Sequence, residues 1–112
     1  MGRRIILSKQ KNFDISQLIT RDDMITKVKE GKKTAVRRNN RYGNVGDTFQ
    51  IANQTYELVR VYEQYLGDVT EANAKEEGFE NLDAYKESIT SIHDNAVWVP
   101  KLVVWVHEFQ PK

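Results

Sequence analysis

The residues best suited to binding chemistry lie in one short basic segment near position 35. Six residues of this segment carry charged or hydroxyl side chains: Lys32, Lys33, Thr34, Arg37, Arg38 and Arg41. Lysine binds a phosphate as a point charge, whereas arginine binds it through a planar pair of N–H donors. In an extended chain, alternate residues share a face, so Lys33 and Arg37 lie together. The segment predicts a phosphate-binding strand, with a solvated, charged edge strand as the alternative.

Four aromatic residues could stack on unpaired nucleic-acid bases: Tyr42, Tyr62, Tyr65 and Trp98. Tyr42 follows Arg41 in a polar loop, so we expect it to be the most exposed of the four. Packing in the core or at its rim is the alternative for each. Trp105, which valines flank on both sides, is expected in the core.

Acid–base and metal chemistry has fewer candidates. Glu76 and Glu77 end a predicted helix, where the helix dipole disfavours a negative charge, so we infer that one of them is kept for function. His93 and His107 are the only histidines, and the chain has no cysteine. No residues at metal-ligand spacing surround the histidines, so we predict no metal and no cofactor. His107 is expected to be buried and hydrogen-bonded.

The composition predicts one small domain with an uneven charge distribution. Of the 112 residues, 39% are hydrophobic and 29% are charged. Residues 1–43 carry 12 Lys+Arg against 4 Asp+Glu, a net charge of +8, whereas residues 44–112 carry 5 against 12, a net charge of −7. This asymmetry favours a polyanionic partner, unless the two parts neutralise each other across the fold. No apolar run approaches the roughly 20 residues that span a bilayer, so we expect a soluble, cytoplasmic protein without membrane contact.

The elements that position these residues are a mixture of helices and strands. Residues 22–30 predict a helix that Gly31 ends, and residues 32–38 then predict the basic strand. Further strands are predicted at 48–51, 55–63 and 102–109, the last with both faces covered. Residues 1–12 form either a peripheral strand or a partly ordered tail. The total is about five strands and three short helices.

Two of these helices lie between the third and last of the main strands. Residues 71–77 predict a helix that Asp68 or Thr70 caps at its beginning and that Gly78 ends. Asn81 caps the next helix, over residues 82–92. Apolar residues recur there at helical spacing, which predicts that one face of the helix is buried: Leu82, Tyr85, Ile89 and Ile92.

The order of these motifs resembles the ASCH (activating-signal-cointegrator homology) domain, a branch of the PUA-like superfamily, and in particular its small prokaryotic stand-alone members. The resemblance covers roughly residues 18–110 and rests on the order of six motifs: Gly31-Lys32-Lys33-Thr34, Val45-Gly46-Asp47, Val61-Tyr62-Glu63-Gln64, Leu66-Gly67-Asp68-Val69-Thr70, Glu77-Gly78-Phe79 and Val104-Trp105-Val106-His107-Glu108-Phe109. It implies an α+β fold, a small, mostly antiparallel β-barrel with short helices packed at its ends. Residues 1–17 would then be a basic N-terminal extension. The resemblance also implies that RNA or a nucleotide-like ligand binds in a cleft beside the Gly-Lys-Lys-Thr segment.

One branch of the family resembles amidohydrolases that act on acetylated cytidine with a lysine, a threonine and a glutamate. The lysine falls on Lys33, and the glutamate falls on Glu77 or Glu76. The threonine falls on Val36, whose side chain has no hydroxyl and cannot act as a nucleophile. Thr34 lies one pleat repeat away, about 7 Å along a strand, which is too far for a silent replacement. The departure at Val36 argues against that reaction.

Three hypotheses follow, of which RNA or nucleotide binding is preferred. The residues expected to form its binding surface are Lys32, Lys33, Thr34, Arg37, Arg38, Arg41, Tyr42, Tyr62 and Trp98. The second hypothesis is a hydrolase, either a nucleoside amidohydrolase or a single-strand ribonuclease, with Lys33 and Glu77 as catalytic residues. The third is a protein-interaction module.

Overall fold

The computed structural model describes residues 18–19, 21–91 and 97–112. The elements, in chain order, are α1 (Asp22–Lys29), β1 (Ala35–Arg38), β2 (Thr48–Ile51), β3 (Gln54–Tyr65), the 3-10 helix η3 (Leu66–Asp68), α2 (Glu71–Glu76), α3 (Leu82–Thr90) and β4 (Val103–Pro111). All three predicted helices and the four main predicted strands are therefore confirmed, with shifted ends. The peripheral strand or tail at 1–12, the extension at 1–17, Ile92 and His93 lie outside the described residues.

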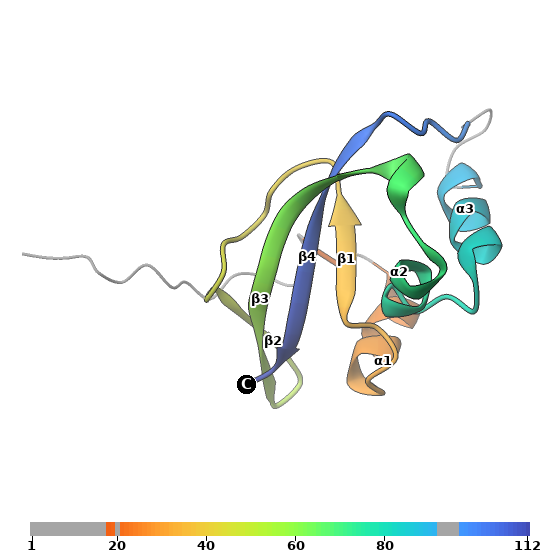
Figure 1. The fold of residues 1–112 in the computed structure, drawn as a ribbon. Helices are drawn as coiled ribbons and strands as arrows, with labels where there is room; N and C mark the ends of the chain where they lie inside the picture. The colour runs from red at the N-terminus through yellow and green to blue at the C-terminus, as the bar shows by residue number, and fades with distance from the viewer. Residues whose placement is uncertain (1–17, 20, 92–96) are drawn as a thin grey trace, which may run out of the picture.

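The four strands form one antiparallel sheet in the order β1-β4-β3-β2. The sheet curls into a half-barrel, and the helices lie beside the β1 edge (Figure 1). A register shift between Leu58 and Arg60 interrupts the β3–β4 ladder. Such an irregularity bends the strand and increases its twist, which favours curling. The predicted α+β fold, an antiparallel barrel-like sheet with short helices, is confirmed.

Two hydrophobic clusters hold the helices against the sheet. The first packs α1 against the sheet, and its aromatic centre joins Phe49 to Tyr56 and Phe109 with ring centroids 5.4 and 5.3 Å apart. The second packs α2 and α3 together through Ala74 and Tyr85. Phe79 packs against both clusters. The segment after α2 therefore lies where the two cores meet.

The end of the chain differs in part from expectation. His107 is fully buried, as predicted. Leu102 and Val103 are 42% and 40% exposed, so the prediction that both faces of this strand are covered is wrong at its beginning. Trp105 is only half-buried, so the prediction that it lies in the core is wrong; the guanidinium of Arg41 lies 5.2 Å from the centroid of its ring.

No helix among the described residues is both long enough and apolar enough to cross a membrane.

Candidate functional site

The turn between α1 and β1 brings Lys33 to the end of α2. Gly31 has φ +78°, a left-handed conformation that glycine adopts without strain and that turns the chain out of α1. The backbone N–H of Thr34 then donates to the carbonyl of Glu76 at 2.7 Å. This bond ties the beginning of the basic segment to α2. The N–H groups of Lys32 and Lys33 donate to the carbonyl of Lys27 in α1, so the ladder of β1 starts only at Ala35, three residues later than predicted.

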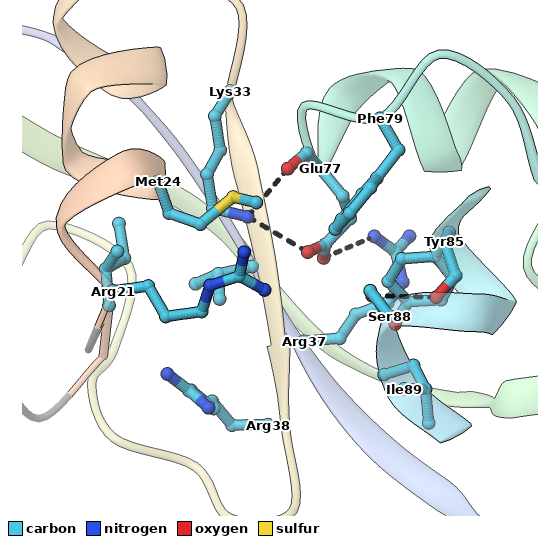
Figure 2. Close-up of a pocket in the computed structure, with 12 residues that line it drawn as sticks. Arg21, Met24, Lys33, Arg37, Arg38, Glu77, Phe79, Tyr85, Ser88 and Ile89 are labelled. Atoms are coloured by element: carbon cyan, nitrogen blue, oxygen red, sulfur yellow. Dashed lines mark hydrogen bonds and ion pairs between the residues drawn. The ribbon is translucent and has the colours of Figure 1, made fainter. Parts of the chain in front are cut away.

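Lys33, Arg37 and Glu77 form a buried ion triad. Lys33 Nζ donates to Glu77 Oε1 at 3.0 Å and to the Glu77 carbonyl at 2.9 Å, and Arg37 Nη1 donates to Glu77 Oε2 at 3.0 Å. Figure 2 shows both cations pointing at the carboxylate. The three residues are 3%, 8% and 4% exposed, respectively. Burial lowers the pKa of Lys33, although the charge of Glu77 opposes this shift.

A second layer of hydrogen bonds positions Arg37. Arg37 Nε donates to Gln64 Oε1 at 2.9 Å, and Gln64 Nε2 donates to Asn73 Oδ1 at 3.3 Å. Asn73 also forms a capping box with Thr70 at the beginning of α2. Of the predicted caps, Thr70 is therefore the one observed. Among the buried side-chain nitrogen and oxygen atoms of the described residues, Arg37 Nη2 has no hydrogen-bond partner.

The triad lies in the wall of a small pocket of about 120 Å³. Arg21 and Arg38 line one side of the pocket, and Tyr85, Ser88 and Ile89 of α3 line the other (Figure 2). Four cationic side chains and one carboxylate take part in the lining. Arg21 pairs with Asp23, but Lys33 and Arg37 share the single carboxylate of Glu77, so the triad carries an excess of one positive charge. Burial and the charge of Glu77 raise the pKa of Tyr85, so its hydroxyl remains protonated.

A larger pocket of about 400 Å³ adjoins the small one and shares four residues with it: Arg37, Arg38, Tyr85 and Ile89. Its other walls are mostly apolar, together with Tyr42 and the two amides of Asn39 and Asn40. We call the two pockets together the β1–α3 cleft, since β1 and α3 both line each pocket. Arg37 and Arg38 stand at the junction of the pockets.

The cleft brings together five of the residues singled out from the sequence: Lys33, Arg37, Arg38, Tyr42 and Glu77. Glu77, rather than Glu76, is the glutamate of the site. Val36, the position that matches the family's threonine, lines the small pocket and supplies no hydroxyl there. Thr34 is exposed and lines neither pocket. Lys32 is also exposed and lies outside the cleft.

The other predicted binding residues are held elsewhere. Arg41 stacks on Trp105, and the hydroxyl of Tyr62 donates to Glu108 at 3.0 Å. Trp98 packs edge-on against Tyr85 with ring centroids 6.4 Å apart. The expectation that Tyr42 is the most exposed of the four aromatic residues is wrong, because Tyr65 is 53% exposed while Tyr42 is half-buried. The ring of Tyr42 packs against the sheet core, and its backbone N–H donates to His107 Nε2 at 3.1 Å.

Several residues of the site were not found from the sequence. Arg21 immediately precedes α1, Gln64 lies in β3 and Asn73 lies in α2, and only the fold brings the three to one site. Tyr85 was placed on the buried face of its helix, which is correct, but that pattern does not reveal a pocket. The two consecutive asparagines after the basic segment, Asn39 and Asn40, are the one signal that points to a binding loop.

Two solved structures resemble this fold. The first is the ASCH domain from Lactobacillus crispatus JV V101, with a TM-score of 0.68 and 14% sequence identity, covering 93% of this chain and 80% of that chain. The second is a protein from Enterococcus faecalis V583 in the family DUF984, with a TM-score of 0.57 and 15% identity, covering 97% and 78%. No protein-family model and no curated protein matches the sequence. The chain has an ASCH-like fold, which confirms the resemblance identified in the sequence.

Proposed function

We propose that the β1–α3 cleft binds a nucleotide unit of single-stranded RNA. The phosphate would lie at the junction of the two pockets, beside Arg37 and Arg38, and the base would enter the larger pocket. The observation that carries the proposal is the unpartnered Nη2 of Arg37. A buried N–H without an acceptor costs about 1–3 kcal/mol, which an arriving phosphate oxygen would relieve.

The charge of the small pocket supports an anionic ligand. Lys33 and Arg37 share the single carboxylate of Glu77, so one positive charge of the triad has no counter-charge within it. Lys33 donates to two oxygen atoms of Glu77, so its role is to hold the carboxylate and thereby orient Arg37. The direct phosphate ligands in this proposal are Arg37, through Nη2, and Arg38, since a guanidinium forms strong charge-assisted hydrogen bonds with a phosphate.

The larger pocket supports the placement of a base. Its volume of about 400 Å³ falls within the range of roughly 300–1,000 Å³ that is usual for small-ligand sites. Its walls are mostly apolar, and the side-chain amides of Asn39 and Asn40 offer both donors and acceptors to a base edge. Unpaired bases are recognised by this combination of apolar contact and edge hydrogen bonds.

Fluorescence anisotropy with a labelled single-stranded RNA hexamer at two salt concentrations tests this proposal. Replacing Arg38 by glutamine should weaken binding about tenfold, because a charge-assisted contact is lost. It should also reduce the salt dependence by about 0.7 on a log–log scale. The matched control is Lys29→Gln, which removes the same charge from an exposed position on α1 outside the cleft. No binding by the wild type at low salt, or equal effects in the two variants, would refute the proposal.

A hydrolase is the second candidate, favoured by the 3.0 Å contact between Glu77 and a lysine whose pKa is lowered by burial. Val36 supplies no nucleophile, so a reaction would use water. Incubation with acetylated cytidine and with single-stranded RNA tests this candidate. Turnover by the wild type that is lost in both Lys33→Met and Glu77→Gln would establish it, and no turnover of either substrate would remove it.

A further inference from the structure

A third depression lies next to the small pocket and shares Phe79 with it. Its volume is about 370 Å³, and its lining includes three lysines, Lys27, Lys32 and Lys75, against one carboxylate, Glu80. Phe79 lines both this depression and the small pocket of the β1–α3 cleft. The two depressions are therefore neighbours. We call the three lysines the outer lysine cluster.

Two lysines donate hydrogen bonds to the carbonyls of the two consecutive residues that precede Phe79. Lys27 Nζ donates to the carbonyl of Gly78 at 2.6 Å and lies 5.3 Å from the centroid of the Phe79 ring. Lys33 Nζ donates to the carbonyl of Glu77 at 2.9 Å. Since residues 77 and 78 are adjacent, the two lysine side chains are held next to each other, one in the cleft and one in the outer depression. Positive charge is therefore present in both depressions.

The remaining two lysines of the cluster are exposed and can bind an anion. Lys32 is exposed and lies 3.6 Å from Glu30, which is exposed as well. An ion pair in water contributes little, so this contact does not prevent Lys32 from binding another anion. Lys75 is exposed in the last turn of α2. Compensation of helix dipoles is the simpler role for Lys27 and Lys75, which both lie in the last turn of a helix, but it does not involve Lys32.

We propose that the outer lysine cluster binds phosphates that flank the nucleotide held in the β1–α3 cleft. The partner is then a single-stranded polynucleotide that passes over Phe79, rather than a free mononucleotide. This inference rests on the proposed function, since the cluster is a continuation of that cleft. Phe79 acts as a spacer rather than as a stacking platform, because Lys27 lies over its ring and the ring also packs edge-on against Tyr85 with centroids 5.5 Å apart.

The test compares ligands of two lengths on the full chain. A nucleoside 5′-monophosphate, followed by NMR chemical-shift titration, reports on the cleft alone, and the RNA hexamer, followed by anisotropy, reports on the cleft and the cluster. The variant is Lys32→Gln/Lys75→Gln, which spares Lys27 and its hydrogen bond. The control is Lys29→Gln/Lys112→Gln, which removes two charges from exposed positions outside both depressions. Thermal unfolding of both variants verifies that they remain folded.

We expect the cluster variant to bind the hexamer about tenfold more weakly, with a salt slope reduced by about 1.4, and to bind the monophosphate as the wild type does. The control should retain both affinities within about twofold. Equal weakening of the hexamer in the two variants, or weakening of the monophosphate by the cluster variant, would overturn the inference. A wild type that binds the monophosphate but binds the hexamer no more tightly would also overturn it while leaving the cleft intact. A wild type that binds neither ligand refutes the proposed function itself.

Discussion

At the scale of single residues, Glu77 determines what its two cationic partners can do. Lys33 and Arg37 were both expected to contact phosphate. The carboxylate accepts one hydrogen bond from Lys33 Nζ and one from Arg37 Nη1, and Gln64 accepts one from Arg37 Nε. These contacts leave Arg37 Nη2 as the unpartnered donor. Of the donors of Lys33 and Arg37, Glu77 therefore leaves Arg37 Nη2 for a ligand and fixes the orientation of the guanidinium.

The first prediction concerns the stability of this triad. Replacing Glu77 by glutamine leaves Lys33 and Arg37 as buried cations without a counter-charge, and such a change typically costs about 3–5 kcal/mol. We expect urea denaturation to show a loss of free energy of unfolding in this range. The control is Glu76→Gln, a half-exposed neighbour whose substitution should change the stability by less than about 0.5 kcal/mol. Equal and small effects in the two variants would mean that the triad does not stabilise the fold.

The second prediction concerns pH and His107. His107 Nε2 accepts the N–H of Tyr42 at 3.1 Å, and its Nδ1 lies 3.4 Å from the carbonyl of Val36, which fixes the neutral tautomer with the proton on Nδ1. Burial lowers the pKa of His107 below its ordinary value of 6.5, and the charges of Arg41 and Arg38 lower it further. The unfolded chain therefore binds a proton first as the pH falls. Stability should be complete above about pH 6.5 and should decrease below it.

The midpoint of urea denaturation, determined at several pH values between 7.5 and 5, measures this effect. The matched variant is His107→Gln, in which an amide oxygen can accept the Tyr42 N–H but does not titrate. We expect its midpoint to change less over this range than that of the wild type. His93 is present in both proteins, so its titration cancels in the comparison. Identical pH dependence of the two proteins would contradict the prediction.

The residues found from the sequence and those that were missed differ in one physical respect. Lys33, Arg37 and Glu77 attract attention because charged side chains stand where a strand or the end of a helix disfavours them. Gln64 and Asn73 are ordinary residues for exposed positions, and their importance comes from a contact between β3 and α2 that no local pattern encodes. Tyr42 was misjudged for the same reason, since its burial depends on His107, which lies 65 residues further along the chain.

At the scale of elements, the turn after α2 determines where the site forms. Gly78 has φ +98° and directs the chain from α2 back towards α3, and a Cβ atom at this position would lie 3.0 Å from Lys27 Cδ. Gly31, in the turn after α1, has φ +78°, but a Cβ atom there would meet nothing within 4 Å. A side chain at either glycine would strain the backbone, but only a side chain at Gly78 would also crowd a neighbouring residue.

The third prediction compares alanine at these two positions. Both substitutions place an L-residue in the left-handed region, which costs roughly 1–2 kcal/mol. Gly78→Ala should destabilise the protein further than Gly31→Ala, because Lys27 must also move away from the carbonyl that it binds. Chemical denaturation of the two variants side by side measures the difference. A Gly31→Ala variant that is the less stable of the two would contradict this account of the turn.

The order and type of the elements were predictable because their boundaries carry strong local signals. Gly31 and Gly78 end helices, Asn81 caps α3 through a hydrogen bond to Ala84 N, and β4 is nearly continuous in apolar residues. The ends of the strands were less predictable. β1 loses its first two predicted residues because their N–H groups bond to the carbonyl of Lys27 in α1. It loses the third because the Thr34 N–H bonds to Glu76, which lies 42 residues further along the chain.

At the scale of the whole molecule, the charge asymmetry of the sequence places several basic side chains in one cleft. The basic first third of the sequence supplies Arg21, Lys33, Arg37 and Arg38 to the cleft, and the acidic remainder supplies Glu77. The overall net charge of +1 provides little general attraction for a polyanion. Binding should therefore depend on entry into the cleft rather than on the average charge of the surface.

The fourth prediction follows from this dependence on entry. A double-stranded RNA of the same length carries more phosphates than a single strand, so a protein that binds through surface charge alone would bind the duplex at least as well. In the proposed function the β1–α3 cleft instead takes up an unpaired base, and extracting one from a duplex costs a few kcal/mol. We expect unlabelled duplex RNA to compete with the labelled single-stranded hexamer at least tenfold less effectively than unlabelled single strands do at the same salt concentration. Equal competition would show that the cleft recognises only the charge of the phosphates. The larger pocket beside Arg37 would then have no part in binding.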